Sequence, residues 1–102
     1  MPASISSNVL SQELASFQVI DVRRRAAFDA SGKMIATAVW RDPAQVDVWC
    51  HQLSGEQPVV VYCVHGHEVS QGCAMSLENA GFDVSYLDGG FAQWIQEGGL
   101  LR

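Results

Sequence analysis

The residues best suited to chemistry lie in one short stretch, 63–70, which reads CVHGHEVS. Cys63 follows the apolar run 59–62, and a helical pattern begins near Ser70. Cysteine is a nucleophile mainly as the thiolate, and free backbone N–H groups at a helix N-terminus lower the pKa of a thiol placed against them. The same N–H groups bind an anion that sits on the sulfur. The stretch therefore predicts a nucleophilic Cys63 in an anion-binding loop.

The rest of the loop supplies space and polarity around the predicted nucleophile. Gly66 allows the chain to curl back over the sulfur without an intervening side chain. His65 and His67 offer positive charge or hydrogen bonds, whereas Glu68 opposes a cationic pocket. The predicted substrate-binding residues are those that follow the cysteine and two arginines that follow other predicted strands: Val64, His65, Gly66, His67, Glu68, Val69, Ser70, Arg23 and Arg41.

The two arginines have two interpretations. A guanidinium binds sulfonate-type oxygens through paired hydrogen bonds, so Arg23 and Arg41 are suited to guiding an anionic donor. Alternatively, each forms an ordinary ion pair with a nearby aspartate, Asp21, Asp42 or Asp88. The sequence leaves both interpretations open.

The cysteines and histidines also have interpretations other than catalysis. Cys63 could be a packed structural residue, Cys73 is expected in the core, and Cys50 is expected to be structural or on the surface. A metal site built from Cys63, His65 and His67 would need a ligand from elsewhere in the chain. We therefore expect no metal and no cofactor.

Apolar segments alternate with helical patterns along the chain. Strands are predicted at 19–22, 38–40, 59–62 and 84–87, and helices near 9–17, 24–30, 42–53, 70–80 and 91–95. This alternation predicts an α/β fold with a parallel sheet and right-handed crossovers. Ligands of such sheets bind at the carboxyl ends of the strands, where Arg23, Arg41, Cys63 and Asp88 fall.

Length and composition predict one compact domain over residues 1–102, since the chain is 48% hydrophobic and 17% charged. No apolar run is long enough for a membrane helix, and the first residues lack the pattern of a signal peptide. Three scattered cysteines without a CxxC pair favour a reducing compartment, so we expect a cytoplasmic protein. We also expect a monomer. The net charge of −5 argues against binding nucleic acid or membranes.

Three motifs resemble the single-domain rhodanese (sulfurtransferase) family. VIDVR at 19–23 is similar to the family's early strand, VVVYCVHGHEVSQG at 59–72 to its active-site region, and AGFDVSYLDGGFAQW at 80–94 to its last strand and turn. The loop and WRDP at 40–43 also resemble rhodanese modules linked to chromate-resistance proteins. The resemblance implies a rhodanese-like three-layer fold: a central, mostly parallel sheet of about four to five strands with helices on both faces.

The resemblance also implies a function. Cys63 would be the catalytic nucleophile of a thiosulfate sulfurtransferase-type enzyme. It would take a sulfane sulfur from a small anionic donor such as thiosulfate, and pass it from the Cys63 persulfide to cyanide, a thiol or a protein acceptor. Two alternatives stay open: a non-catalytic sulfur-carrier or regulatory module, and an oxyanion enzyme of the arsenate-reductase or phosphatase type.

The loop departs from the common rhodanese pattern in length and charge. Ser70 stands seven positions after Cys63, whereas the common loop places this serine at the sixth. The greater length is closer to the rhodanese-fold phosphatases and arsenate reductases, but these close the loop with an arginine where this chain has Val69. The missing arginine counts against phosphatase or arsenate chemistry, and the longer loop leaves the preferred donor open.

Overall fold

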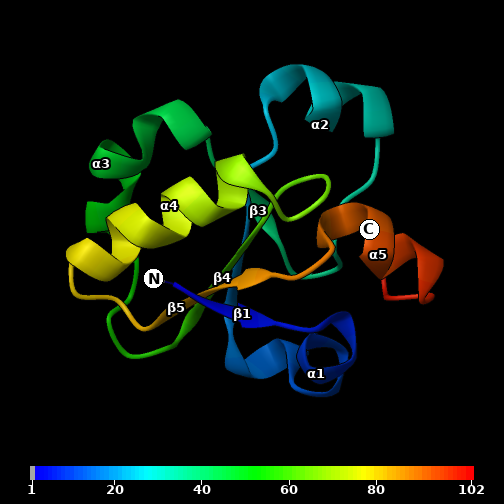
Figure 1. Ribbon diagram of the computed structural model, residues 1–102, viewed down its shortest axis with the longest axis horizontal. Helices are drawn as coiled ribbons and strands as arrows, with labels where there is room; N and C mark the ends of the chain where they lie inside the picture. Colours follow the sequence, from blue (N-terminus) through cyan, green and yellow to red (C-terminus); the bar gives the residue numbers. More distant parts are fainter. Residues whose placement is uncertain (1) are drawn as a thin grey trace.

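A computed structural model of the chain, which describes residues 2–102, shows a five-stranded sheet between layers of helices (Figure 1). All strand pairs are parallel, in the order β1-β5-β4-β2-β3. The strands are β1 (Ala3–Ile5), β2 (Gln18–Asp21), β3 (Val39–Trp40), β4 (Val59–Tyr62) and β5 (Val84–Leu87). The helices are α1 (Ser7–Gln12), α2 (Arg25–Ser31), α3 (Val46–Trp49), α4 (Glu68–Asn79) and α5 (Gly90–Gln96). The predicted α/β fold with a parallel sheet is confirmed.

The central strand β4 divides the core into two clusters. Val59 and Val61 belong to the cluster that includes Trp49 of α3 and Leu77 of α4. Residues that alternate with them, such as Val60, belong to the other cluster, which draws on α1 and α5. Successive side chains of a strand point to opposite faces, so an all-apolar strand is the pattern expected where helices cover both faces.

The register of the sheet brings the ends of three strands to one edge. Asp21, the last residue of β2, pairs with Tyr62 at the end of β4 and with Trp40 at the end of β3. The segments that follow these strands therefore leave the sheet side by side. This alignment brings Arg23, Arg41 and Cys63 to the same edge, as the sequence predicted.

The first strand, β1, lies where the sequence predicts none. β1 is three residues long, two of them exposed, and it pairs with β5 at the edge of the sheet. A short polar edge strand carries no hydrophobic pattern, so only its tertiary pairing reveals it.

Helix starts follow the capping residues of the sequence, but several helices differ in extent from the prediction, and the one predicted near 9–17 ends at Gln12. Ser6 accepts a hydrogen bond from the Val9 N–H (3.2 Å), and Asp42 accepts one from the Ala44 N–H (2.9 Å). The predicted helix at 42–53 is broken into α3 and two 3₁₀ turns, and α4 begins at Glu68, earlier than predicted. Within residues 2–102, no helix has both the length and the apolar character needed to cross a bilayer.

Candidate active site

Cys63 lies directly after β4, at the carboxyl end of the central strand. Its side chain is buried, and its thiol donates a hydrogen bond to the Ser70 hydroxyl in the first turn of α4, with a sulfur–oxygen distance of 3.1 Å. Because this contact joins the two ends of the segment 63–70, the residues between them form a closed loop. The position of Cys63 is as predicted, and its catalytic role stays a prediction.

The backbone of this loop is anchored to α5 through carbonyl groups, and a run of its N–H groups is unpaired within residues 2–102. The carbonyls of Cys63 and Val64 accept hydrogen bonds from the N–H groups of Phe91 (2.9 Å) and Ala92 (3.0 Å) in α5. Within residues 2–102, the N–H groups of residues 64–70 have no hydrogen-bond acceptor. Unpaired N–H groups in a loop that leads into a helix N-terminus form an anion-binding cradle.

Two glycines allow the loop to pack directly on the turn before α5. Gly66 has φ +75°, and a Cβ there would lie 2.7 Å from the Leu87 carbonyl oxygen. Gly90 has φ +62°, and a Cβ there would lie 2.6 Å from the carbonyl oxygens of both Cys63 and Val64. Backbone therefore packs against backbone, and side chains at these two positions are excluded by both conformation and space.

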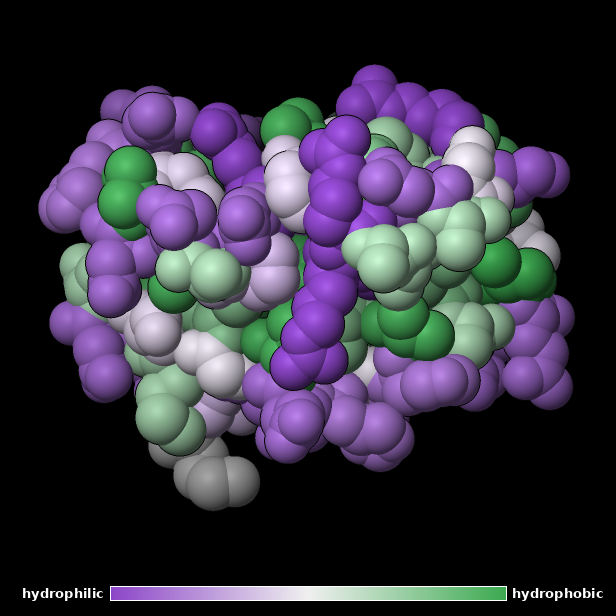
Figure 2. Space-filling view, turned by 90° about the horizontal axis from the view of Figure 1, so that it is seen from above, coloured by the Kyte–Doolittle hydropathy of each residue, from purple (hydrophilic) through white to green (hydrophobic). Residues whose placement is uncertain are grey.

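A cavity of about 370 Å³ opens over Cys63, between the loop and the start of α2. Most of the predicted loop residues line it, together with residues of the segment after β2: Arg23, Arg24, Ala26, Ala27, Cys63, Val64, His65, His67, Glu68 and Val69. Gly66 lines a separate hollow on the other side of the loop, beside Asp88. Figure 2, which views the molecule over α2, α3 and α4, shows apolar patches on either side of a hydrophilic band that crosses the middle of this face.

Arg23 forms an ion pair inside the protein. Its guanidinium lies 2.6 Å from the Asp21 carboxylate, and both side chains are almost completely buried. It also donates to the Lys33 carbonyl (2.7 Å) and lies 4.2 Å from the centre of the Phe91 ring. The Tyr62 hydroxyl donates to Asp21 (2.9 Å), and burial together with the Asp21 charge raises the pKa of Tyr62 far above its usual range. Of the two interpretations, the structure supports the ion pair.

Arg41 lies away from the cavity over Cys63, whereas Arg24 lies beside it. Arg41 donates to the Gln52 side chain (2.8 Å) and is not among the residues that line the cavity over Cys63. Arg24 lines that cavity, and within residues 2–102 its guanidinium has no hydrogen-bond or ion-pair partner. Arg24 was not predicted at the site, because the sequence pattern places it inside the predicted helix 24–30. In the structure it stands one residue before α2, at the N-cap position.

The remaining polar residues of the loop face solvent. His65 and His67 are exposed, and their ring centroids are 6.3 Å apart. In the part of the chain that the structure describes, no group of three or more histidine, cysteine or acidic side chains is placed to hold a metal ion.

Cys73 lies on α4 one turn beyond Ser70, with its sulfur 3.9 Å from the Pro43 carbonyl oxygen. Burial, followed by the nearby Cys63 and Asp42, raises the pKa of the Cys73 thiol from 9.0 to about 11.

Near pH 8, iodoacetamide should therefore alkylate Cys73 about a hundredfold more slowly than the same thiol in urea-unfolded protein. The reason is that each unit by which the pKa rises lowers the fraction of reactive thiolate about tenfold. The rate should rise as the pH approaches 11. Peptide mass spectrometry measures it, and equal rates in folded and unfolded protein would contradict the prediction.

The fold and the site together define an α/β domain that presents a cysteine loop at the carboxyl edge of a parallel sheet. A family model described as the rhodanese-like domain matches residues 6–97. The chain therefore belongs to the rhodanese-like domain family, as the sequence motifs indicated.

Solved structures share this fold over nearly the whole chain. A rhodanese-related protein from Thermoplasma volcanium is 24% identical, with a TM-score of 0.88, 98% of this chain covered and 97% of that one. The rhodanese-like domain of a protein from Anabaena sp. is 29% identical, with a TM-score of 0.84, 100% of this chain covered and 80% of that one. A Rhodopseudomonas palustris protein described as a possible tyrosine phosphatase is 19% identical, with a TM-score of 0.85, 99% of this chain covered and 85% of that one. At these identities, the first and third show the fold alone.

Proposed function

We propose that this protein is a sulfurtransferase that carries sulfur as a Cys63 persulfide. The observation that supports the proposal most directly is the closed loop from Cys63 to Ser70, whose N–H groups at 64–70 have no acceptor within residues 2–102. A persulfide and a sulfur oxyanion are both negatively charged, and such a cradle stabilises negative charge without reorganising. Membership of the rhodanese-like family is compatible with this activity.

The first half of the reaction forms the persulfide. The Cys63 thiolate attacks the outer sulfur of thiosulfate, a new sulfur–sulfur bond forms, and the donor's sulfur–sulfur bond breaks so that sulfite leaves with the electron pair. The Ser70 hydroxyl, 3.1 Å from the sulfur, can turn to donate a hydrogen bond to the thiolate. The loop N–H groups hold the charge of the outer sulfur and of the departing sulfite.

The second half returns the enzyme to its starting state. A nucleophilic acceptor such as cyanide or a thiol attacks the outer sulfur, and Cys63 leaves as the thiolate. The two halves form a double-displacement scheme through a covalent intermediate, with no oxidant or reductant consumed.

An oxyanion enzyme of the phosphatase or arsenate-reductase type is a weaker proposal for this site. The loop has the length of such enzymes, but Val69 occupies the position of their oxyanion-binding arginine. A guanidinium positioned within such a loop supplies the paired hydrogen bonds that a phosphoryl-type oxyanion needs. Arg24 lines the cavity and has no partner within residues 2–102, but it comes from the segment before α2 and is exposed.

Intact mass spectrometry after incubation with thiosulfate tests the proposal. The wild-type protein is expected to gain one sulfur atom, Cys63→Ser is expected to gain none, and Cys73→Ala is expected to gain it as the wild type does. Absence of the adduct with thiosulfate and also with inorganic polysulfide would overturn the proposal. Steady-state formation of thiocyanate from cyanide then separates an enzyme from a sulfur carrier that turns over poorly.

A further inference from the structure

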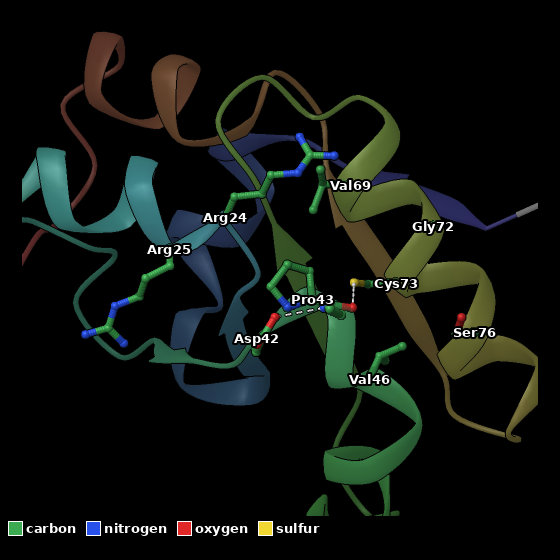
Figure 3. A pocket seen from close by; sticks show the side chains of 10 residues that line it. Arg24, Arg25, Asp42, Pro43, Val46, Val69, Gly72, Cys73 and Ser76 are labelled. Atoms are coloured by element: carbon green, nitrogen blue, oxygen red, sulfur yellow. Dashed lines mark hydrogen bonds between the residues drawn. The ribbon is translucent and has the colours of Figure 1, made fainter.

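A second cavity adjoins the one over Cys63. Its volume is about 440 Å³, and it lies between the start of α2, the turn that precedes α3, and α4 (Figure 3). Arg24 and Val69 line both cavities, so the two meet at these residues. Pro43, Val46 and Cys73 contribute to its wall. A hollow of this size accommodates an organic ligand and is far larger than thiosulfate or cyanide requires.

The positively charged side chain of Arg24 lies at the junction of the two cavities. Figure 3 shows the guanidinium of Arg24 beside Val69 at the start of α4, whereas Arg25 points away from it. Arg25 is engaged elsewhere, with Asp29 at 3.1 Å and the Trp40 ring at 5.1 Å. Arg24 has neither a hydrogen bond nor an ion pair within residues 2–102. An unpaired cation in a protein of net charge −5 is a local attraction for an anionic group.

The depth of the second cavity depends on a glycine inside a helix. Gly72 lies in the interior of α4 and lines the cavity, and a Cβ built there would meet nothing within 4 Å. Its φ lies outside the positive range, so neither backbone conformation nor packing calls for glycine. Glycine is a poor residue in a helix interior. What its missing side chain provides here is the open space of the cavity.

We propose that the second cavity binds the organic part of a carboxylate-bearing thiol that accepts sulfur from Cys63, and that Arg24 pairs with its carboxylate. This inference rests on the proposed sulfurtransferase function and names the class of acceptor. The acceptor's sulfur enters the cavity over Cys63 while the remainder of the molecule occupies the second cavity. Asp42, the acidic residue of that cavity, accepts the Ala44 N–H and disfavours a carboxylate on its side. The carboxylate is therefore directed toward Arg24.

The transfer step balances without another reagent. The acceptor thiolate attacks the outer sulfur of the Cys63 persulfide and forms a new sulfur–sulfur bond. The bond between the Cys63 sulfur and the outer sulfur breaks, and Cys63 leaves as the thiolate held by Ser70 and the loop N–H groups. The product is the organic persulfide of the acceptor.

Single-turnover discharge of the persulfide tests the role of Arg24. The protein is loaded with inorganic polysulfide, and the Cys63 adduct is verified by mass. Decay of the adduct is then followed after adding 3-mercaptopropionate or 2-mercaptoethanol, a thiol of similar size that lacks the carboxylate. For Arg24→Gln we expect the second-order rate constant to fall about tenfold with the acidic thiol and less than twofold with the neutral one. Arg24→Lys should keep most of the rate, and added salt should weaken the preference.

Glutathione, a larger thiol with carboxylates, tests the cavity. Gly72→Leu fills the space and should slow discharge by glutathione about tenfold, while the rate of discharge by 2-mercaptoethanol should stay unchanged. The control is Asn79→Leu, at an exposed position of α4 away from both cavities, which should change neither rate. Equal losses for acidic and neutral thiols, or no loss for the acidic ones, would overturn the inference alone. Failure to form the Cys63 persulfide would overturn the proposed function as well, so the two failures are distinguishable.

Discussion

Replacement of Asp21 by asparagine is expected to lower the free energy of unfolding by about 3–5 kcal/mol. Arg23, which is 2% exposed, would lose its counter-charge while remaining buried, and the Tyr62 hydroxyl would lose a charged acceptor. Breaking a buried pair from one side is costly because the remaining charge stays without compensation. Small domains are stable by only about 5–15 kcal/mol, so this change removes a large share of the total.

Urea unfolding followed by tryptophan fluorescence measures the loss, since Trp49 and Trp94 are both buried. The matched control is Asp29→Asn, which breaks the ion pair of Asp29 with Arg25 on the surface, where the side chains are 56% and 66% exposed. An exposed pair of this kind contributes about 0.3–0.5 kcal/mol. Similar losses in the two variants would show that burial of the Asp21 pair is not what makes it important.

Gly90→Ala is expected to damage both stability and the site. A Cβ at Gly90 would lie 2.6 Å from the backbone of Cys63, Val64 and Gly66, and the residue has φ +62°. We expect the unfolding free energy to fall by about 2–5 kcal/mol, combining the left-handed conformation with overpacking. The loop must move to relieve the contacts, and a displacement near 1 Å costs about a hundredfold in rate, here that of persulfide formation.

The control for Gly90 is Gly32→Ala. Gly32 has nearly the same conformation, φ +66°, but a Cβ there would meet nothing within 4 Å. It should therefore show only the conformational cost, about 1–2 kcal/mol, and normal persulfide formation by intact mass. If the two variants lost the same stability and Gly90→Ala kept its rate, the close packing of the loop on the turn before α5 would not be what shapes the site.

Local patterns were enough to predict most of the fold. The all-apolar run 59–62 indicated a strand covered on both faces, and it is the central strand β4. Asp42 followed by Pro43 predicted a helix start, and both take these positions in the structure. β1 could not be predicted in the same way, because it owes its strand conformation to pairing with β5 rather than to its own residues.

In the site too, some features follow from the local sequence and others only from tertiary packing. Sequence alone determined that Cys63 stands at the end of a buried strand before a Gly-containing loop and a helix, since these features depend on neighbouring residues. Only the tertiary structure decided which arginine has no partner within residues 2–102, because Arg23, Arg24 and Arg25 are adjacent and chemically equivalent in the sequence. Asp21 neutralises the first inside the protein and Asp29 pairs with the third on the surface, which leaves Arg24 at the cavity. Charge pairing depends on where chain segments meet, and that is settled by packing rather than by local sequence.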